Sequence, residues 1–400
     1  MKIVYVIDSL ASKGGAERIV SDKLNYMAEH YGYDVYIITC YQNQQKDPNT
    51  YYLSEKVSQI NLNISYYRQY RYRYPHRLWV KWTIYRRLIK LLRDTVRQID
   101  PDVLVALGYF MADVVTGIPC RAVKLVESHD ARSFSMLGKG LKRSFLSKAY
   151  MELYRKYYLR QVERRADMIV TLSDAEAKEW MKAKRVEVIP NFTVMPVWRQ
   201  STCQNKRVMA AGRLEWQKGF DCLIASWAMV HDKHPDWHLH IFGSGTMKHQ
   251  LIEQITFHGL EEVITIHPYT SAIDKEYSDS SIFALSSRFE GFGLVLLEAM
   301  QSGLPCVTFD CPFGPSEVVI DNQTGFVVDN GDVATFADKL CCLIEDESLR
   351  KRFSEASVER AKHYDVEKVM NRWKTLLEGL LRQECTQKLF KTFSTIGAIS

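Results

Sequence analysis

Short apolar runs alternate along the chain with longer stretches whose apolar residues recur at helical spacing. Runs of four or five residues that are bounded by polar residues or glycine indicate buried strands. In the first half the predicted strands are Val4–Ile7, Asp34–Ile38, Val103–Ala106, Val123–Val126, Met168–Thr171 and Val186–Ile189. In the second half they are Val208–Ala211, His238–Phe242, Val263–Ile266, Ile282–Leu285 and Cys306–Phe309. Because strands that alternate with helices are typical of parallel sheets covered by helices, the pattern predicts an α/β fold.

The same pattern divides the chain into two doubly wound domains. A polar stretch of linker composition, about Val197–Lys206, separates the two series of strands. We expect a first domain over residues 1–197, a second over 206–365, a helix over 366–383 and a tail over 384–400. The 400 residues, 46% of them hydrophobic, are enough for two cores of ordinary size.

A glycine-rich loop joins the predicted strand Ile282–Leu285 to a helix that begins near Leu294. Such a junction exposes unpaired backbone N–H groups at the helix start, which suits a phosphate. Glu290 lies in the loop and Glu298 in the second helical turn. An ionised carboxylate only accepts hydrogen bonds, so it matches the hydroxyls of a sugar. From spacing alone, a sugar-nucleotide site and an incidental pair of glutamates remain equal alternatives.

Other loops that follow predicted strands carry glycine or basic residues. Gly14 and Gly15 open a helix after the first strand, Gly243 follows His238–Phe242, and Arg213 and Lys218 follow Val208–Ala211. Two cations at a strand end can bind a diphosphate, although the spacing alone favours solvated loop charges. The chain lacks a dinucleotide fingerprint and a Walker lysine, which argues against nicotinamide and nucleoside-triphosphate enzymes.

Two of these stretches resemble signatures of one enzyme family. Residues 286–303 read Ser-Ser-Arg-Phe-Glu-Gly-Phe-Gly-Leu-Val-Leu-Leu-Glu-Ala-Met-Gln-Ser-Gly, which resembles the two-glutamate signature of the retaining glycosyltransferases of family GT4. Residues 212–219, Gly-Arg-Leu…Lys-Gly, resemble a second signature of that family. The resemblance implies the GT-B architecture: two Rossmann-like domains facing each other across a cleft, with the terminal helix packed back on the first domain.

The resemblance also implies roles for individual residues. Four are expected to act in catalysis, namely Glu290 on hydroxyls of the donor sugar, His129 on the same sugar, and Arg213 and Lys218 on the pyrophosphate. Glu298 is expected to hold the ribose. Further donor contacts are implied for Gly14, Gly15, Gly243, the backbone at Tyr269, and the amides of Gly291, Phe292, Gly293 and Leu294. On the acceptor side the candidates are Asp130 and Arg132.

The implied reaction transfers a hexose or N-acetylhexosamine from a nucleotide sugar to a lipid-linked or saccharide acceptor, with retention of configuration. UDP is the expected nucleotide, and GDP is not excluded by any side chain. No metal-binding motif is evident, so neither a metal nor a further cofactor is expected. The loop Pro312–Glu317 resembles the form found in some bacterial surface-polysaccharide transferases, which indicates a capsule or O-antigen type of glycan. The alternatives are a sugar-nucleotide epimerase or glycoside phosphorylase on the same fold, and a non-catalytic membrane-associated adaptor.

Cysteine and histidine usage points to no disulfide framework and no metal site. Nine cysteines without paired spacing do not form such a framework. His238 and His240 would share one face of a strand, where a structural role is favoured over metal binding. The opening apolar run is cut by Asp8 and is too short for a signal peptide, so we expect a cytoplasmic protein.

The net charge of +6 is unevenly distributed. Residues 1–200 contain 33 Lys and Arg against 20 Asp and Glu, and residues 201–400 contain 20 against 27. The basic excess lies mainly in two stretches, Arg77–Ile99 and Lys139–Arg165, which also carry many aromatic residues. In Arg77–Ile99 the apolar residues recur at helical spacing, which predicts a helix with one apolar stripe. Such stretches either pack on the sheet with solvated charges or lie on anionic lipid. Together they favour contact of the first domain with the inner face of the cell membrane. Nucleic acid is not an expected partner, because no recognition fold is present.

Overall fold

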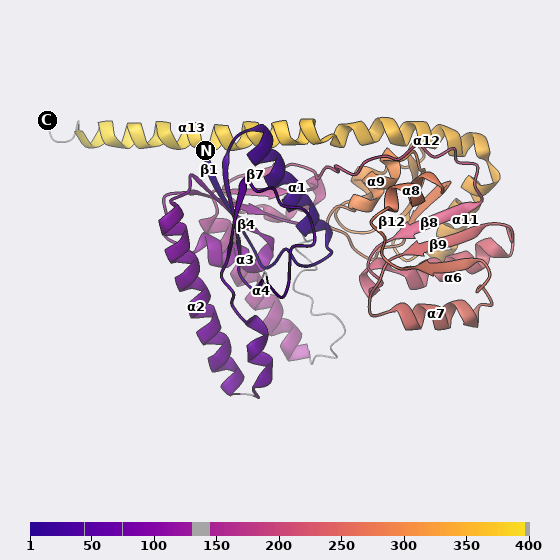
Figure 1. The fold of residues 1–400 in the computed structure, drawn as a ribbon, viewed down its shortest axis with the longest axis horizontal. Helices are drawn as coiled ribbons and strands as arrows, with labels where there is room; N and C mark the ends of the chain where they lie inside the picture. The colour runs from indigo at the N-terminus through magenta and orange to yellow at the C-terminus, as the bar shows by residue number, and fades with distance from the viewer. Residues whose placement is uncertain (44, 74, 130–144, 397–400) are drawn as a thin grey trace. The chain divides into compact units, whose positions relative to one another are not determined.

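The computed structural model describes residues 1–400 except 44, 74, 130–144 and 397–400. The chain forms two compact units (Figure 1). The first contains Met1–Ile189 and the chain from Val369 onward, and the second contains Pro190–Lys368.

A seven-stranded parallel sheet forms the centre of the first unit, with the strand order β3-β2-β1-β4-β5-β6-β7. Its strands are β1 (Lys2–Ile7), β2 (Asp34–Thr39), β3 (Val57–Asn61), β4 (Val103–Leu107), β5 (Val123–Glu127), β6 (Met168–Thr171) and β7 (Val186–Val188). The six predicted strands are all present, and β1, β4 and β5 are almost entirely buried. The sequence analysis did not predict β3. Its Val-Ser-Gln-Ile-Asn sequence is half polar, as is usual for a strand at the edge of a sheet.

Helices connect these strands. They are α1 (Gly15–His30), η1 (Tyr66–Arg71), α2 (His76–Ile99), α3 (Gly108–Thr116), α4 (Phe145–Arg165), α5 (Asp174–Ala177) and η2 (Lys178–Trp180). Leucine, isoleucine and valine side chains of α2, α3 and α4 pack with those of the strands in one continuous core. The predicted helix over Arg77–Ile99 is confirmed as α2.

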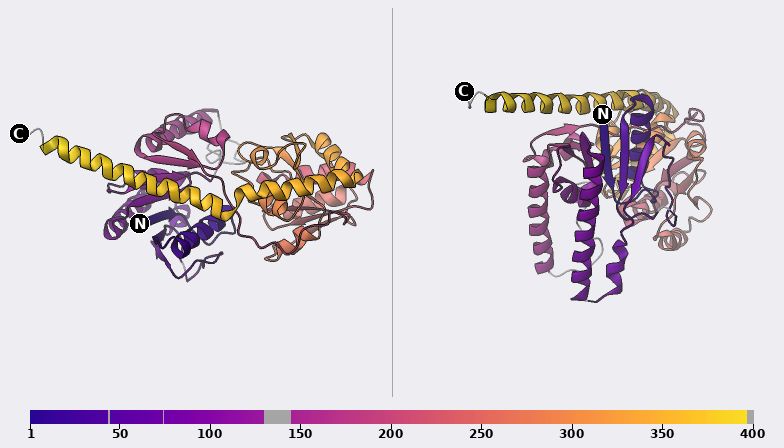
Figure 2. Two further views of the ribbon diagram at one scale, coloured as in Figure 1. Left: turned by 90° about the horizontal axis from the view of Figure 1, so that it is seen from above. Right: turned by 60° about the vertical axis from the view of Figure 1, so that its left-hand side comes forward.

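The two halves of α2 have different surroundings. In its C-terminal half Leu88, Leu92 and Val96 are fully buried against the sheet, as expected for an amphipathic helix. In its N-terminal half Trp79 and Trp82 are 60% and 53% exposed. Figures 1 and 2 show this half projecting beyond the sheet together with η1 and the first turns of α4. The apolar stripe read from the sequence is therefore a core stripe over only half of its length.

The last helix, α13 (Val366–Ile396), packs on the first unit, as the yellow helix of Figure 2 shows. Trp373 is 1% exposed, and Tyr33 donates a hydrogen bond to Glu378 at 3.2 Å. From the sequence we expected this helix to end at residue 383, with a tail over residues 384–400. The helix continues because no proline or glycine lies between Leu380 and Ile396.

A six-stranded parallel sheet forms the centre of the second unit, with the strand order β10-β9-β8-β11-β12-β13. Its strands are β8 (Arg207–Ala211), β9 (His238–Phe242), β10 (Ile264–His267), β11 (Ile282–Leu285), β12 (Cys306–Asp310) and β13 (Gly325–Asp329). The five predicted strands are present, whereas β13 was not predicted, because its Gly-Phe-Val-Val-Asp sequence has an apolar run of only three residues. Two parallel sheets of this kind confirm the predicted α/β fold class.

The helices of the second unit are η3 (Trp216–Lys218), α6 (Phe220–His231), α7 (Lys248–Phe257), α8 (Ile273–Ser278), α9 (Leu294–Gln301), α10 (Pro315–Val318), α11 (Val333–Glu345), α12 (Glu347–Ala361) and η4 (Lys362–Tyr364). Because all six strands are parallel, the loops that follow β8, β9, β10 and β11 lie at the same edge of the sheet. These loops contain most of the residues predicted to bind a ligand.

Candidate functional site

The loops after β8 and β11 are joined by hydrogen bonds into a single structure. The backbone N–H of Arg288 donates to the carbonyl of Gln217 at 2.8 Å. The Ser286 hydroxyl donates to the carbonyl of Lys218 at 3.0 Å, and the Gln217 amide donates to the carbonyl of Phe289 at 3.1 Å. β8 and β11 are neighbours in the sheet, so their carboxyl ends bring these loops together. The two sequence signatures therefore form one site.

Glycine is required where the two loops touch. Gly219 has a φ of +62°, in the left-handed region, and a Cβ atom there would lie 2.0 Å from the carbonyl oxygen of Ser286. At the end of β9, a Cβ atom on Gly243 would lie 1.9 Å from the carbonyl oxygen of Gly212. The predicted role of Gly243 was a ligand turn, and the structure adds a packing reason for this glycine.

Arg288 holds the joined loops to α6. Its guanidinium makes a bidentate pair with Asp221, at 2.8 and 2.6 Å, and donates to the carbonyl of Trp216 at 2.7 Å. It also lies over the Trp216 ring at 4.8 Å. Burial alone would raise the pKa of Asp221, but the hydrogen bonds and charge of Arg288 outweigh burial and lower it. Arg288 belongs to the two-glutamate stretch, and its side chain fixes the joined loops to α6. This supporting role was not predicted from the sequence.

Lys218 and Glu290 form an ion pair at the centre of the joined loops. Lys218 Nζ lies 2.6 Å from Glu290 Oε1, and the Ser287 hydroxyl donates to the same oxygen at 2.6 Å. Both charged side chains are largely buried, with 13% and 8% of their surface exposed. A buried charge needs such a partner, because burial removes its hydration. An ammonium group has three donors and a carboxylate about four acceptor positions, so each group retains capacity for a ligand.

Arg213 lies on the surface of the same loop. Its side chain is exposed, and Nη2 lies 3.4 Å from the side-chain oxygen of Gln217. Since Gln217 also binds the carbonyl of Phe289, it links Arg213 to the glutamate loop. Of the two predicted pyrophosphate ligands, Lys218 is thus fixed by an ion pair and Arg213 is open to solvent.

The helix α9 begins directly after the glutamate loop. Its N-cap, Gly293, has a φ of +86° and no side chain with which to cap this helix end. Phe292 is 3% exposed and packs edge-on against Tyr364 at 5.7 Å, so its side chain belongs to the core. The amides of Gly291, Phe292, Gly293 and Leu294 thus precede or begin a helix whose N-terminus has no side-chain cap, an arrangement that favours an anion.

Glu298, the second glutamate of the signature, lies within helix α9. It is 4% exposed, and its Oε2 atom accepts a hydrogen bond from the Tyr277 hydroxyl at 2.9 Å. Tyr277, on α8, is completely buried. The position of the Glu298 carboxylate is therefore set by a tyrosine that the sequence analysis did not single out.

The loop after β10 contains Tyr269, which is 47% exposed. Just before it, His267 stacks on His240 and on Phe242, and the two histidine rings share a 2.8 Å hydrogen bond. Burial and then the charge of Arg207 lower the pKa of His240 to about 4, so its ring is neutral near pH 7. Among the residues that the structure describes, no three or more His, Cys, Asp or Glu side chains are placed to hold a metal ion.

The first unit contains the remaining predicted residues. Gly14 is the N-cap of α1, and the carboxylate of Glu17 lies against this turn and accepts a hydrogen bond from Ser12. His129 follows β5, is 9% exposed and hydrogen bonds to Glu127. Asp130 and Arg132, the acceptor-side candidates, lie outside the described residues.

Comparison with known proteins identifies the family. Residues 200–360 match the family model described as glycosyl transferases group 1, and residues 13–193 match that of glycosyltransferase family 4. Over 385 residues the chain is 30% identical to an uncharacterized glycosyltransferase of Haemophilus influenzae, covering 94% of this chain and 99% of that protein. This chain belongs to the GT4 glycosyltransferases.

Two further comparisons place the glycosyltransferase among its relatives. It is 37% identical over 174 residues to the amylovoran biosynthesis glycosyltransferase AmsD of Erwinia amylovora, covering 44% of this chain and 48% of AmsD. Its fold resembles that of an S. aureus TarM mutant crystallised with fondaparinux, alpha-GlcNAc-glycerol and UDP. That match has a TM-score of 0.73 and 16% identity, and covers 94% of this chain and 99% of TarM. The GT-B fold and the enzyme class expected from the sequence are confirmed.

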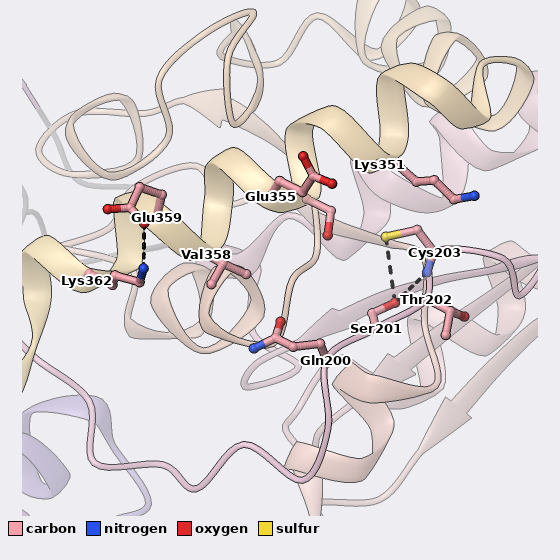
Figure 3. Close-up of a pocket in the computed structure, with 10 residues that line it drawn as sticks. Gln200, Ser201, Thr202, Cys203, Lys351, Glu355, Val358, Glu359 and Lys362 are labelled. Atoms are coloured by element: carbon pink, nitrogen blue, oxygen red, sulfur yellow. Dashed lines mark hydrogen bonds and ion pairs between the residues drawn. The ribbon is translucent and has the colours of Figure 1, made fainter.

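A hollow of about 490 Å³ also lies on the second unit of the glycosyltransferase, and no residue of the joined loops is in its lining (Figure 3). It is lined by the linker before β8 and by α12, and Figure 3 shows Lys362 paired with Glu359 at its rim. The lining residues are Gln200, Ser201, Thr202, Cys203, Lys351, Ser354, Glu355, Val358, Glu359 and Lys362. None of them was predicted to bind the donor, and their charges are of both signs.

Proposed function

We propose that this glycosyltransferase moves a hexose or N-acetylhexosamine from a UDP-sugar to a lipid-linked or saccharide acceptor in the synthesis of a bacterial surface glycan, with retention of configuration. The observation that carries the proposal is the Lys218–Glu290 pair within the joined loops. It places a cation suited to a phosphate next to a carboxylate suited to sugar hydroxyls. A nucleotide sugar has both groups, linked through its anomeric carbon.

The nucleotide part of the proposal assigns the diphosphate to three groups. Lys218 and Arg213 supply positive charge, and the uncapped N-terminus of α9 supplies backbone N–H groups. Glu298, oriented by Tyr277, accepts hydrogen bonds from the ribose. UDP is proposed as the nucleotide because the fold resembles TarM, whose crystals contained UDP.

The chemical step needs charge stabilisation more than covalent catalysis. The bond between the anomeric carbon and the β-phosphate oxygen breaks, and a bond from that carbon to the acceptor oxygen forms on the same face. The acceptor proton passes to the departing phosphate. Negative charge that develops on the UDP is met by Lys218 and Arg213, without a metal ion or other cofactor. Glu290 is engaged by Lys218 and Ser287, so we assign it to holding sugar hydroxyls and not to nucleophilic attack.

Contributions from the first unit rest on the resemblance alone. We propose that His129 contacts the donor sugar and that the Gly14–Gly15 turn contacts the donor phosphate. In the structure the carboxylate of Glu17 lies against this turn, so a phosphate bound there requires Glu17 to move.

The surface-glycan part of the proposal is supported by AmsD, which acts in amylovoran biosynthesis. A lipid-linked acceptor requires access to a membrane surface. The exposed end of the first unit fits this requirement, because it combines aromatic and basic side chains. Tyr70, Leu78, Trp79 and Trp82 are each more than half exposed. We call these four residues the aromatic patch.

Basic side chains surround the aromatic patch. Lys81, Arg86 and Arg87 are exposed, and the Arg86 guanidinium lies 4.7 Å from the centre of the Trp82 ring. Aromatic rings partition to the headgroup region of a bilayer, and basic side chains are attracted to anionic lipid. We propose that this end of the unit contacts an anionic membrane from one side. Among the described residues, no helix is long and apolar enough to span a bilayer.

Calorimetric titration of the purified protein with UDP and GDP, and then with their sugar conjugates, tests the donor. Preferential binding of UDP and of one UDP-sugar supports the proposal, and release of UDP from that sugar identifies the donor. Binding of neither nucleotide would contradict the assignment and favour a non-catalytic adaptor. Rearrangement of the sugar without an acceptor would indicate an epimerase, and exchange with inorganic phosphate a phosphorylase.

A further inference from the structure

His129 belongs to a buried cluster of ionisable side chains in the first unit. The other members are Lys23 from α1 and Glu127 at the end of β5. The side chains of Lys23 and Glu127 are 2% and 0% exposed. Buried ion pairs are costly to form and are weak evidence for stability, so this pair calls for a reason other than folding.

The contacts in this cluster converge on one oxygen atom. Glu127 Oε1 accepts a hydrogen bond from the ammonium group of Lys23 and lies 2.8 Å from Nε2 of His129. On its other side Lys23 Nζ lies 4.1 Å from the centre of the Trp373 ring, so α13 closes the cluster. Glu127 therefore touches His129 while Lys23 and Trp373 fix Glu127.

The charge of Glu127 determines which ring nitrogen of His129 carries a hydrogen. Burial alone would raise the pKa of Glu127, but the charge of Lys23 and the hydrogen bonds from Lys23 and His129 outweigh burial and lower it to about 2. Tyr5, nearby on β1, stays neutral because burial and the charge of Glu127 raise its pKa. An ionised carboxylate can only accept hydrogen bonds. The nitrogen that faces it, Nε2, must therefore carry the hydrogen, and Nδ1 is left facing away from Glu127.

We propose that Glu127, fixed by Lys23 and Trp373, is a positioning residue that holds the His129 ring with Nε2–H toward the interior and presents Nδ1 to the donor sugar. The proposal rests on the sugar contact assigned to His129 above. A ring of fixed orientation and tautomer loses no freedom when the sugar binds, which favours the reactive geometry. Without the carboxylate, the ring would rotate and exchange between tautomers.

The orientation is tested first on the wild-type protein, without any substrate. Selective ¹⁵N labelling of histidine distinguishes protonated from bare ring nitrogens by their chemical shifts, and the His129→Asn variant assigns the signals. We expect Nε2 to be protonated. A neutral His129 ring with its hydrogen on Nδ1 would overturn the proposal without any further variant.

Two matched double variants then separate the hydrogen bond from the charges. Lys23→Met with Glu127→Gln removes both charges but keeps an acceptor for Nε2–H. Lys23→Met with Glu127→Leu also removes the acceptor, at similar side-chain size. Neither leaves an unpaired buried charge, so both are expected to have similar melting temperatures. The single variant Glu176→Gln is the control, because Glu176 is a buried carboxylate that binds the neighbouring Ser128 instead of His129.

The readouts are the His129 tautomer, the affinity for UDP, and the rate of UDP release from UDP-glucose and UDP-N-acetylglucosamine. We expect the leucine variant to lose the Nε2–H tautomer and to release UDP about tenfold more slowly or worse, with UDP affinity unchanged. The glutamine variant should restore both the Nε2–H tautomer and the rate of UDP release. Two outcomes would overturn the positioning role. One is slower UDP release in the leucine variant although its His129 keeps the Nε2–H tautomer, and the other is an equal rate of UDP release in the leucine and glutamine variants.

The same experiments separate this proposal from the function on which it rests. If neither sugar nucleotide is bound or cleaved, the proposed function fails, while the tautomer still decides whether Glu127 orients the ring. If His129→Asn leaves UDP release unchanged, the sugar contact assigned to His129 fails, and with it the catalytic value of the orientation.

Discussion

Lys218 and Glu290 are 72 positions apart in the chain, yet the ammonium nitrogen of one lies 2.6 Å from a carboxylate oxygen of the other. Each is the central charged residue of one family signature. Because they share a hydrogen bond, the groups assigned to the phosphate and to the sugar hydroxyls depend on each other for position. A substitution that removes this hydrogen bond at either residue is therefore expected to affect the other.

Replacement of Glu290 is expected to slow UDP release from the donor sugar and to leave UDP binding nearly unchanged. Glu290→Gln keeps an acceptor for Lys218 and Ser287 but removes the charge. We expect UDP release from the donor sugar to fall about 100-fold, and the affinity for UDP itself to change by less than about threefold. Glu215→Gln is a matched control, because Glu215 binds Thr246 on the adjacent turn. Full activity in Glu290→Gln would contradict the assignment.

Replacement of Lys218 is expected to weaken phosphate binding. A hydrogen bond to a charged group contributes about 1.5–3 kcal/mol, so Lys218→Met should weaken UDP binding about 10- to 100-fold. Uridine, which has no phosphate, should bind the variant and the wild type equally in the same titration. An equal loss of affinity for uridine and UDP would mean that Lys218 acts only on the structure of the loop.

The Arg288–Asp221 pair predicts a dependence of stability on pH. The folded-state pKa of Asp221 lies below its ordinary value of 3.8, so the pair stabilises the fold above pH 3.8 and the stabilisation is lost as pH falls through the lowered pKa. At pH 7 we expect Asp221→Asn to be less stable by about 1–2 kcal/mol. The difference in melting temperature between wild type and variant should narrow on acidification.

A matched control for that experiment is Asp338→Asn in the same unit. Asp338 pairs with Lys233 at 3.4 Å, but both side chains are more than half exposed. Exposed pairs contribute little, so this variant should melt like the wild type at every pH. If the two variants behave alike, Arg288 and Asp221 do not support the loops as described.

Removal of metal ions is expected to leave the reaction intact. With Lys218 and Arg213 assigned to the leaving diphosphate, dialysis against EDTA should change neither UDP affinity nor UDP release by more than about twofold. The measurement is made before and after addition of Mg²⁺ or Mn²⁺. Recovery of a lost activity on adding either ion would show that a cation takes part.

The aromatic patch is expected to bind anionic vesicles. Replacement of both Trp79 and Trp82 by serine should weaken binding to vesicles of phosphatidylglycerol and phosphatidylcholine by at least about tenfold. Added salt should weaken the wild-type interaction by screening the basic side chains. Phe257→Ser is the control, because Phe257 is 84% exposed on α7 of the other unit. Equal binding by all variants would remove the membrane part of the proposal.

The sequence was sufficient to predict the strands that are buried on both faces, because these are continuous apolar runs. It was not sufficient for β3 and β13, which lie at the edges of their sheets. β3 is half polar, and the apolar run of β13 has only three residues. Likewise, the helical spacing in α2 predicted the helix but not where its apolar stripe leaves the core. That point depends on the length of the neighbouring strands, which lie elsewhere in the chain.

The candidate site, like the fold, was predicted only in part from the sequence. Family signatures predicted Lys218 and Glu290, but not their ion pair, since contact requires β8 and β11 to be neighbours. The supporting roles of Arg288 and Tyr277 were also not predicted. Their side chains act through Asp221 and Glu298, and such partners can be recognised only when the fold brings them together.

The hydrogen bonds that join the loops after β8 and β11 also bear on the thermodynamics of donor binding. A loop that orders only around its ligand reduces affinity by the conformational entropy it loses. Here the hydrogen bonds that hold the backbone of Gln217 and Lys218 to the opposite loop are made between protein groups alone. The nucleotide therefore meets a preorganised surface. Amide hydrogen exchange in these two loops should accordingly be slow in the free enzyme and should change little when UDP binds.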